Sequence, residues 1–581
     1  MSEPVLALLT ARVEDAIRRA FGPDVAKPEQ VVLPTRDPRH GDYSSPAAMT
    51  AAKALGRNPF ELAEELAAAL DVGDICETPE VMRPGFVNVR LRSDWLASRL
   101  SAEVGDDRLG LSPVADPELV VVDYSAPNVA KEMHVGHLRS TVIGDCLANV
   151  LEHVGHRLDR VNHVGDWGAQ FGMLLVHLEE LRGAGQALDL SDVEAFYRAA
   201  NARDKEDDEF RQRARRRVVE LQAGEESARA AWSELVELTR QNNQGVYDLL
   251  DVTGLEERGE SFYQPMLDDV VEELERIGLL VEDQGAKVVF VEGFSNKEGD
   301  PLPLIVQNRH GGYGYATTDL AALRHRVRDL GAKRVIYVVD AGQSQHLAMV
   351  FVVARNAGWV PDDVEVTHVS FGLVLGEDGK RLRTRSGDNV RLRALLQEAV
   401  DRARAFVVER AEERGDELPG DLEDVARTIG IGAVKYADLS QNRQSNYVFS
   451  FDRMLTLKGN TAPYLQYAYA RMRSILREAG WAEQPPASPQ VLLDHETEVE
   501  LAKRLVATGD VLVRLAEEYA PNHLCAHLYD VSQAFNQFYE HCRVLQVDEP
   551  VRTSRLALCE VTARTLRTGL ALLGIGVLER I

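Results

Sequence analysis

The sequence predicts an α/β protein with a parallel-sheet central domain, helical insertions, a small N-terminal α+β domain and a C-terminal all-α helical bundle. Short β-branched apolar runs such as Leu119–Tyr124 are typical of strands buried on both faces of a parallel sheet. Helical patterns separate these runs, and strand–helix–strand alternation indicates a doubly wound sheet. From about Leu422 onward the strand signals vanish and helical spacing of apolar residues takes over.

The N-terminal part of the chain, residues 1 to about 112, has the pattern of a small α+β domain. Apolar residues at helical spacing predict helices over about 4–21 and 46–70, and Gly85–Leu91 predicts a short strand. The stretch Gly105–Pro117 is rich in Gly, Asp and Pro, so we expect a loop there.

The central domain is expected over residues 113–420. Its strand candidates are Leu119–Tyr124, Arg160–Val164, Arg334–Val339 and Val364–Leu375, and a helix is predicted over about Gly136–His153. Residues from about 185 to 285 are rich in Arg, Glu and Ala and predict inserted helices. Residues 421–581 form the predicted bundle, with Gln484–Pro489 as a loop between two of its helices.

Size and composition indicate ordinary globular material. A chain of 581 residues suggests three or four domains, and 45% apolar with 27% charged residues is normal for them. The uncharged apolar stretch Gly569–Leu578 is too short for a membrane span, which needs about 20 residues. The N-terminus has the pattern of an amphipathic helix and not of a secretory signal. We therefore expect a cytoplasmic protein without membrane contact.

The cysteine pattern and the net charge limit which metal ions and macromolecules we expect the chain to bind. Five cysteines without a CxxC pair make disulfides and a structural metal site unexpected, so we predict small buried thiols. A net charge of −26 taken alone argues against a nucleic-acid partner, although binding depends on one local face. We expect no DNA partner.

The strongest motif is Pro127–His137, which follows the first strand and opens a helix. Free backbone N–H groups and the helix dipole favour phosphates at such a helix start. His134 and His137 share one helix face, and Gly136 leaves room for a flat adenine ring. The two imidazoles could hold a triphosphate as charge builds during attack at the α-phosphorus. The alternative is two solvated histidines at a helix start.

A second motif, Gly376–Gly387, follows the last strand candidate. Gly376, Gly379 and Gly387 favour mobility. Its cationic residues are Lys380, Arg381, Arg383 and Arg385. A mobile basic loop can close over pyrophosphate and stabilise it as it leaves. The alternative is a solvated surface loop.

Together the two motifs resemble those of class I aminoacyl-tRNA synthetases, which carry HxGH on a Rossmann-like catalytic domain and a basic loop after its second half. Further stretches are similar to the arginyl enzymes: Ser125–Lys131, His137–Gly144, Gly165–Gly172, Thr384–Gly387, Asn460–Arg471, Gly41–Tyr43 and Gly85–Asn88. The resemblance implies an arginine–tRNA ligase that activates L-arginine with ATP, releasing pyrophosphate, and transfers arginine to the terminal ribose of tRNA(Arg). It also implies a tRNA-binding N-terminal domain, an anticodon-binding bundle, tRNA bound before activation, and a monomer.

Two positions depart from the family's usual pattern. Thr384 replaces the second lysine of the basic loop, and Lys131, three residues before the first histidine, offers an ammonium to the same phosphates. Glu132 stands where the family often has proline. We expect Glu132 to face solvent with little effect, because a carboxylate is tolerated near a helix N-terminus.

The resemblance also implies site residues. The catalytic set is His134, His137, Lys131, Lys380, Arg383 and Arg385, and Pro127, Gly136 and Thr384 join the histidines in binding ATP. Guanidinium carries five donors, so its pocket needs carboxylates and neutral acceptors. The implied set for arginine is Asn128, Tyr315, Asp319, Gln343 and Glu260. Tyr464, Tyr467 and Asn536 are candidates for tRNA contact. We expect Mg²⁺ to travel with ATP, because no dedicated carboxylate cage is evident.

Three alternatives remain open. The first is another class I synthetase, such as the cysteinyl or glutamyl type. The cysteinyl enzyme needs a zinc site for which no Cys/His spacing is present. The second is a small-molecule nucleotidyltransferase with the same HxGH phosphate site. The third is a non-catalytic paralogue that binds RNA, which the intact His134, His137 and Lys131 argue against.

Overall fold

The computed structural model describes residues 3–35, 37–185, 193–296, 298–383, 390–415, 417–481, 486 and 488–580. It has two compact units. The bundle unit comprises Met1–Pro113, Thr456–Leu572 and Gly576–Ile581, and the sheet unit comprises Val114–Leu455 and Leu573–Ile575. The predicted domain boundaries near residues 112 and 420 stay a prediction, because this division follows compactness alone.

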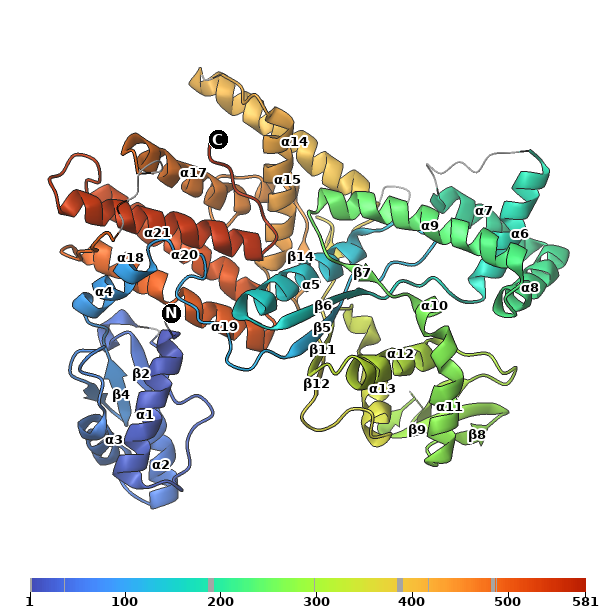
Figure 1. Ribbon diagram of the computed structural model, residues 1–581, viewed down its shortest axis with the longest axis horizontal. Helices are drawn as coiled ribbons and strands as arrows, with labels where there is room; N and C mark the ends of the chain where they lie inside the picture. Colours follow the sequence, from blue (N-terminus) through green and yellow to red (C-terminus); the bar gives the residue numbers. More distant parts are fainter. Residues whose placement is uncertain are drawn as a thin grey trace. The chain divides into compact units, whose positions relative to one another are not determined.

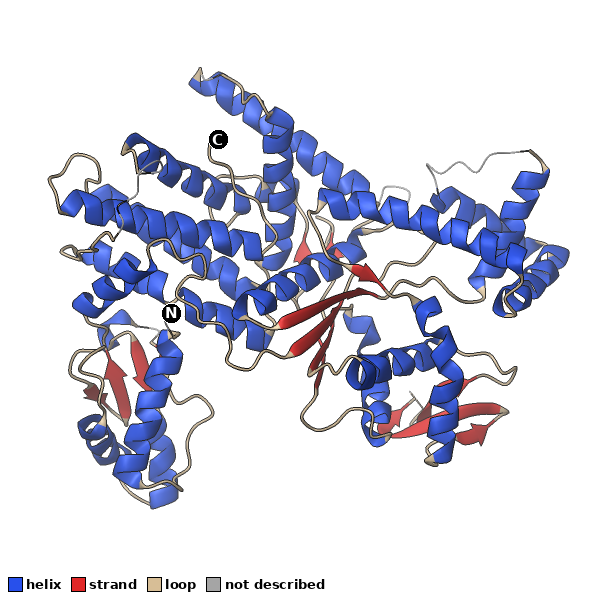
Figure 2. Cartoon of the chain, in the orientation of Figure 1, coloured by secondary structure: helices blue, strands red, loops and turns tan. Residues whose placement is uncertain are grey.

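A parallel sheet in the order β12-β11-β5-β6-β7 forms the centre of the sheet unit (Figures 1 and 2). Its strands are β5 (Leu119–Asp123), β6 (Arg157–Asn162), β7 (Glu256–Glu257), β11 (Arg334–Tyr337) and β12 (Glu365–His368). Every neighbouring pair is parallel. The predicted parallel α/β domain is therefore confirmed, and the carboxyl ends of β5, β6 and β11 lie along one edge, where ligands bind in such sheets.

Helices pack against this sheet. The predicted helix after the first strand is α5 (Val135–Val154), which contacts β5 and β6. A separate core joins Val121 and Val161 of the sheet to α11 (Leu267–Arg276), α12 (Tyr315–Arg324) and α13 (Ser344–Asn356). Two longer helices, α14 (Leu392–Arg414) and α15 (Leu422–Leu439), also contact α5 and belong to the sheet unit.

The insertion contains strands as well as the predicted helices. Its helices are α6 (Gln170–Gly183), α7 (Val193–Glu206), α8 (Asp208–Gln222), α9 (Glu226–Leu249) and α10 (Glu260–Tyr263). Between α9 and α10, β7 joins the parallel sheet, and an antiparallel sheet follows, made of β8 (Val281–Asp283), β9 (Ala286–Ser295) and β10 (Pro301–Gln307) (Figure 2). The wholly helical expectation was wrong at β7 because its two residues are glutamates, which carry no strand signal.

The expected strand Val364–Leu375 is two short strands in different sheets. β12 ends at His368, and β13 (Val374–Leu375) pairs in parallel with β14 (Tyr447–Val448). A strand therefore occurs after Leu422, against our expectation. Two-residue strands are too short to show a period-2 pattern, so no sequence pattern marks them. A short helix, α16 (Phe451–Met454), follows β14.

The N-terminal part of the bundle unit is an α+β structure, as predicted. Its sheet has the order β1-β2-β4-β3, with β1 (Leu33–Pro34), β2 (Tyr43–Ser45), β3 (Glu80–Met82) and β4 (Phe86–Val89). Its helices are α1 (Val5–Phe21), α2 (Ala47–Leu55), α3 (Pro59–Ala69) and α4 (Ser93–Glu103). The helix predicted over 46–70 is broken. Gly56 is left-handed at φ 63°, and Asn58 caps the new helix that Pro59 begins.

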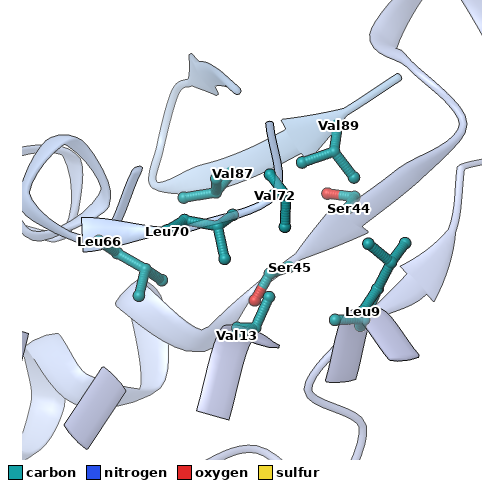
Figure 3. A pocket seen from close by; sticks show the side chains of 10 residues that line it. Leu9, Val13, Ser44, Ser45, Leu66, Leu70, Val72, Val87 and Val89 are labelled. Carbon is teal, nitrogen blue, oxygen red and sulfur yellow. The ribbon is translucent and has the colours of Figure 1, made fainter. Parts of the chain in front are cut away.

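The core of this α+β part is closely packed. Leu9 and Val13 of α1 face Val87 and Val89 of β4 across a cavity of about 10 Å³ (Figure 3). Because a single water molecule fills about 10–15 Å³ on this scale, the space is a packing defect and not a ligand site.

The rest of the bundle unit is helical: α17 (Ala462–Glu478), α18 (Glu496–Val506), α19 (Thr508–Glu518), α20 (Asn522–His541) and α21 (Val551–Leu572). Polar contacts join it to the α+β part. Asp510 of α19 accepts hydrogen bonds from the Leu6 backbone N–H at 2.9 Å and from the Tyr43 hydroxyl at 3.0 Å. Lys503 pairs with Asp42 at 2.9 Å.

All five cysteines are buried and free, as predicted. Among the described residues, the helices are all too short or too polar to traverse a bilayer.

Candidate active site

The loop between β5 and α5 carries the central residues of the candidate site. Ser125, Ala126 and Ala130 have positive φ, which is unusual for residues other than glycine, so the surroundings must hold them there. The Ala126 N–H donates to Asn162 at 3.0 Å, and the Ala130 N–H donates to Thr239 of α9 at 3.0 Å. The sheet and the inserted helices thus fix this loop jointly.

His134 and His137 lie together at the first turn of α5. The Nδ1 atom of His134, the N-cap residue, accepts from the Gly136 N–H at 3.0 Å, and Nδ1 of His137 accepts from the His134 N–H at 3.0 Å. The two rings are stacked with their centroids 4.0 Å apart. Because both Nδ1 atoms accept, the proton of each neutral imidazole is on Nε2, which leaves two donors for a ligand.

Both imidazoles are neutral near pH 7. Burial lowers the pKa of His134, and the cationic Arg381 and Lys131 lower it further. Burial, followed by His134 and Lys131, lowers the pKa of His137 to about 3. The two histidines therefore act as uncharged hydrogen-bond donors beside the positive end of a helix.

Gly136 is required by its neighbour. A Cβ at this position would stand 2.8 Å from the ring of His134, so a side chain would displace the imidazole. We expected Gly136 to leave room for an adenine ring, but the ring of His134 lies against the place where a Cβ would be. The guanidinium of Arg381 reaches within 3.9 Å of the same point. One arm of the basic loop therefore lies beside the histidines.

The basic loop is anchored as a hairpin next to β13. Leu375 bridges to Arg381, and the Leu382 N–H donates to Val374 at 3.0 Å. Lys380 and Arg383 are exposed. Thr384 and Arg385 lie outside the described residues, as does Gly387.

Glu132 does not simply face solvent. It is half-buried and pairs with Arg391, Oε2 to Nε 3.1 Å. Arg391 is next to Val390 and Leu392, which pair with the backbone at Val135 and Met133. The expectation was wrong because the segment after the basic loop returns along the start of α5, which the sequence did not reveal. Lys131 is exposed, and its ammonium lies over the ring of Tyr197 at 4.9 Å from the centroid.

A cluster of carboxylates forms the other part of the site. Asp319 lies one turn into α12 after Tyr315, which is 76% exposed, and Oδ2 of Asp319 accepts a hydrogen bond from Nε2 of His346 of α13 at 2.6 Å. Glu260, at the start of α10, is near enough to Asp319 and Asp166 to interact electrostatically. Three acids with one histidine match the charge that a guanidinium requires.

Glu260 is the acid of this cluster whose pKa is raised close to neutral pH. Burial, then Asp166 and Asp319, raise the pKa of Glu260 to about 7. Asp166 is itself held by Ser261, whose N–H and hydroxyl donate to it at 2.8 and 2.5 Å. A cation bound here would relieve the repulsion between these acids.

The remaining predicted residues lie at the ends of strands. Pro127 is buried and Asn128 is exposed in the β5–α5 loop, and Asn128 bridges to Gly165, where a Cβ would stand 2.5 Å from the Asn128 Oδ1. Gln343 is exposed in the short helix η4 (Ala341–Gln343) after β11. Asn128 and Gln343 thus follow adjacent strands of the sheet.

The sequence reasoning missed His346, Asp166 and Tyr247. The Tyr247 hydroxyl of α9 lies 2.8 Å from Ser125 Oγ and 3.0 Å from Asn162 Nδ2, directly beneath the β5–α5 loop. Asp166 lies within Gly165–Gly172, a stretch that is similar to the arginyl enzymes, and this similarity could have identified it. His346 follows Gln343 by one helical turn, which was a weaker signal.

The candidates for tRNA contact are in the bundle unit. The Tyr464 hydroxyl of α17 accepts hydrogen bonds from Gln533 and Asn536 of α20, both at 2.7 Å. Tyr467 is half-exposed on the same helix. Tyr469 is 2% exposed and donates to Glu579 at 2.7 Å, so it belongs to the core.

Three family models match successive parts of the chain. The arginyl tRNA synthetase N terminal domain matches residues 7–91, the catalytic domain of class I (R) tRNA synthetases matches residues 104–451, and the DALR anticodon binding domain matches residues 465–581. The catalytic model alone spans more than half of the chain.

Similar proteins agree with these models over their full length. An arginine–tRNA ligase of a Synechococcus species is 54% identical over 583 residues, covering 99% of each chain. The crystal structure of arginyl-tRNA synthetase from Plasmodium falciparum matches with a TM-score of 0.88 at 30% identity, covering 100% of each chain. The arginyl-tRNA synthetase of Thermus thermophilus matches with a TM-score of 0.83 at 25% identity, covering 99% of this chain and 100% of that one.

Proposed function

The chain belongs to the arginyl-tRNA synthetases and is an arginine–tRNA ligase, and from that premise we propose which of its side chains carry each part of the reaction. The arginine carboxylate attacks the α-phosphorus of ATP, and pyrophosphate leaves. A terminal ribose hydroxyl of tRNA(Arg) then attacks the carbonyl of the arginyl-adenylate, and AMP leaves. The protein's share in such a reaction is to position the reactants and to stabilise charge.

The ATP phosphates bind at the N-terminus of α5. This assignment rests on one observation above all: Arg381 of the basic loop lies beside His134 at the start of the helix. His134 and His137 donate from Nε2 to phosphate oxygens, and their neutral state costs no proton transfer when charge develops. Lys131 supplies a cation from the helix side. It takes the place of the second lysine of the basic loop, a position that Thr384 occupies in this chain.

Arg381 joins the catalytic set. Lys380, Arg383 and Arg385 stay in that set as predictions, with Arg381 added because it lies nearest to the histidines among the described loop residues. Pro127 and Gly136 shape the backbone on which the phosphates rest.

The guanidinium of arginine binds to Asp319 and Glu260. Asp319 is oriented by His346, and Glu260 faces two further acids, so a planar cation with several donors fits this cluster. Asn128 and Gln343, at the ends of β5 and β11, hold the amino and carboxylate end of the substrate. Tyr315 packs against the aliphatic part from its exposed position on α12.

The other expectations fit this scheme without further structural detail. Mg²⁺ enters with ATP as part of the substrate, and the described residues contain no carboxylate and histidine group that could hold a separate ion. Tyr464, Tyr467 and Asn536 contact tRNA(Arg). The protein acts as a monomer in the cytoplasm, where tRNA is charged for translation.

Two matched variants test the assignment. His134→Asn keeps a side chain that can cap α5 but removes the Nε2 donor, so kcat should fall by about 10²–10³-fold with a KM for arginine close to that of the wild type. Asp319→Ala should instead raise the KM for arginine by at least about 10²-fold while ATP binding stays measurable, since it strands a buried cation. The assay is ATP–pyrophosphate exchange with saturating tRNA.

The two variants fail in different ways if the assignment is wrong. An unchanged kcat in His134→Asn would remove the phosphate role from α5. Unchanged arginine kinetics in Asp319→Ala would move the guanidinium pocket elsewhere without affecting the ATP site.

A further inference from the structure

One buried ion pair and one buried electrostatic interaction join α5 to α15. Arg139 of α5 pairs with Asp438 of α15, Nε to Oδ2 3.1 Å, and Asp145 further along α5 interacts with Lys435 of α15. All four side chains are at most 4% exposed. The charges are reversed between the two pairs, so a shift of α5 along α15 would bring like charges together at low dielectric. The pairs therefore fix the position of α5 along its axis.

Lys435 has a further partner from a distant part of the chain. Its ammonium donates to the carbonyl oxygen of Gly574 at 2.7 Å. Residues Leu573–Ile575 belong to the sheet unit, although the chain on either side of them belongs to the bundle unit. Gly574 has a φ of 69°, and a Cβ there would stand 2.8 Å from Lys435 Nζ and 3.0 Å from Asp145 Oδ2. Any side chain at this glycine would displace the Lys435 ammonium or the Asp145 carboxylate.

The chain that follows Gly574 is attached to α17 within the bundle unit. Gln466 donates to the carbonyl of Gly576 at 2.8 Å. Glu579 accepts from the Tyr469 hydroxyl at 2.7 Å and from Arg473 Nε at 3.0 Å. The segment 573–580 is thus held at one end by Lys435 and at the other by α17, the helix that carries Tyr464 and Tyr467.

We propose that Lys435 is a positioning residue for arginine activation, and that its bond to Gly574 couples the C-terminal segment 573–580 to the placement of His134 and His137. The proposal rests on the proposed role of these histidines. Asp145 and the first turn with His137 are on one continuous helix, so a shift of α5 at Asp145 also moves that turn. A misplacement of about 1 Å at a reacting group can cost about 10²-fold in rate. A movement of segment 573–580 therefore reaches the phosphate site through Lys435, Asp145 and α5.

Gly574→Ala tests the coupling, with Gly415→Ala as its control. Both glycines have nearly the same φ, 69° and 70°, but a Cβ at Gly415 meets nothing within 4 Å. In ATP–pyrophosphate exchange with saturating tRNA, we expect Gly574→Ala to lower kcat at least about tenfold while the KM for arginine changes less than about twofold. Gly415→Ala should leave both parameters within about twofold of the wild type. Equal effects of the two substitutions would overturn the proposal.

A double variant separates positioning from a general loss of structure. If the added Cβ acts by displacing the ammonium, Gly574→Ala should cost little more in a Lys435→Met background, because Met carries no charge to displace. If the fold-losses in kcat of the two single variants multiply fully in the double variant, the proposal is overturned. Glu579→Ala covers the case in which the buried variants fail to fold, since the Glu579 side chain is 57% exposed.

Glu579→Ala should lower kcat at least about threefold with an unchanged melting temperature, and an unchanged kcat would also overturn the proposal. Failure of the proposed function is seen separately, as an unchanged kcat in His134→Asn. If His134→Asn loses activity and Gly574→Ala does not, the histidine assignment stands and only the coupling through Lys435 falls.

Discussion

At the scale of single residues, we expect Glu260 to give the proposed arginine site its pH dependence. Its pKa is raised to about 7 by burial and by Asp166 and Asp319. A bound guanidinium favours the ionised carboxylate, so arginine must displace a proton whenever the pH is below 7. We expect the KM for arginine to rise about tenfold between pH 8 and pH 6, because about nine-tenths of Glu260 is neutral one unit below its pKa.

The same titration should leave kcat nearly unchanged. Both histidines favour the neutral form, since burial lowers the pKa of His134 and lowers that of His137 to about 3. Initial rates of exchange at pH 6, 7 and 8 measure both parameters, and Glu260→Gln is the control, which should raise the KM but flatten its pH dependence. A KM that rises equally steeply in Glu260→Gln would assign the proton to another group.

Residues inside contiguous motifs could be predicted, and their partners from elsewhere in the chain mostly could not. His134 and His137 share a four-residue pattern, and Asp319 stands in a recognisable stretch. His346, which holds Asp319, lies 27 residues further along, and Arg391, which pairs with Glu132, lies just after the basic loop and far from Glu132 in the sequence. Such pairs depend on which strands are adjacent, and the local sequence does not state this.

At the scale of elements, length decided what could be predicted. β5 contains the apolar run Leu119–Val122, and β11 begins the apolar run Val335–Val339, and each run is long enough to indicate a buried strand. β7, β13 and β14 have two residues each and exist because a neighbouring strand offers hydrogen bonds. The break between α2 and α3 was readable, because Gly56 and the Asn58–Pro59 pair are stop and start signals that the apolar spacing concealed.

The inserted helix α9 should contribute to both stability and activity through Tyr247. Its hydroxyl bonds to Ser125 and Asn162, which are 2% and 0% exposed. Tyr247→Phe leaves these two groups without that partner, so we expect a loss of about 1–3 kcal/mol in the free energy of unfolding. The KM for ATP should also rise, because Ser125 begins the loop that leads to the histidines. Urea unfolding and exchange kinetics measure the two effects.

Tyr529→Phe, in α20, is a suitable control for the loss of a tyrosine hydroxyl. Tyr529 contacts the ring of Tyr464, and among the described residues its hydroxyl makes no hydrogen bond, so removal of its oxygen should change the free energy of unfolding by less than about 0.5 kcal/mol. Equal losses in the two variants would show that the hydrogen bonds of Tyr247 are not the source of its contribution.

At the scale of the whole molecule, the chain brings its two ends into one compact unit, and the residues of the proposed reaction site are in the other. The matched family models follow the same division, with the N-terminal and anticodon-binding models at residues 7–91 and 465–581 and the catalytic model between them. The polar contacts of Asp510 with Leu6 and Tyr43 hold the two end regions together. Partners 467 and 504 residues apart could not be predicted from the sequence.

Asp510 makes this internal contact sensitive to pH. Burial raises its pKa to about 6, so the folded state binds a proton more tightly than the unfolded state, and the stability of the contact rises as the pH falls through 6. Asp510→Asn keeps an acceptor for the Leu6 N–H and does not titrate. We compare the free energy of unfolding of the variant with that of the wild type at each pH. The difference, variant minus wild type, should be about 1–2 kcal/mol larger at pH 8 than at pH 5. Urea unfolding of the full chain at both pH values measures this difference, and an identical difference at pH 8 and pH 5 would mean that Asp510 does not titrate between them.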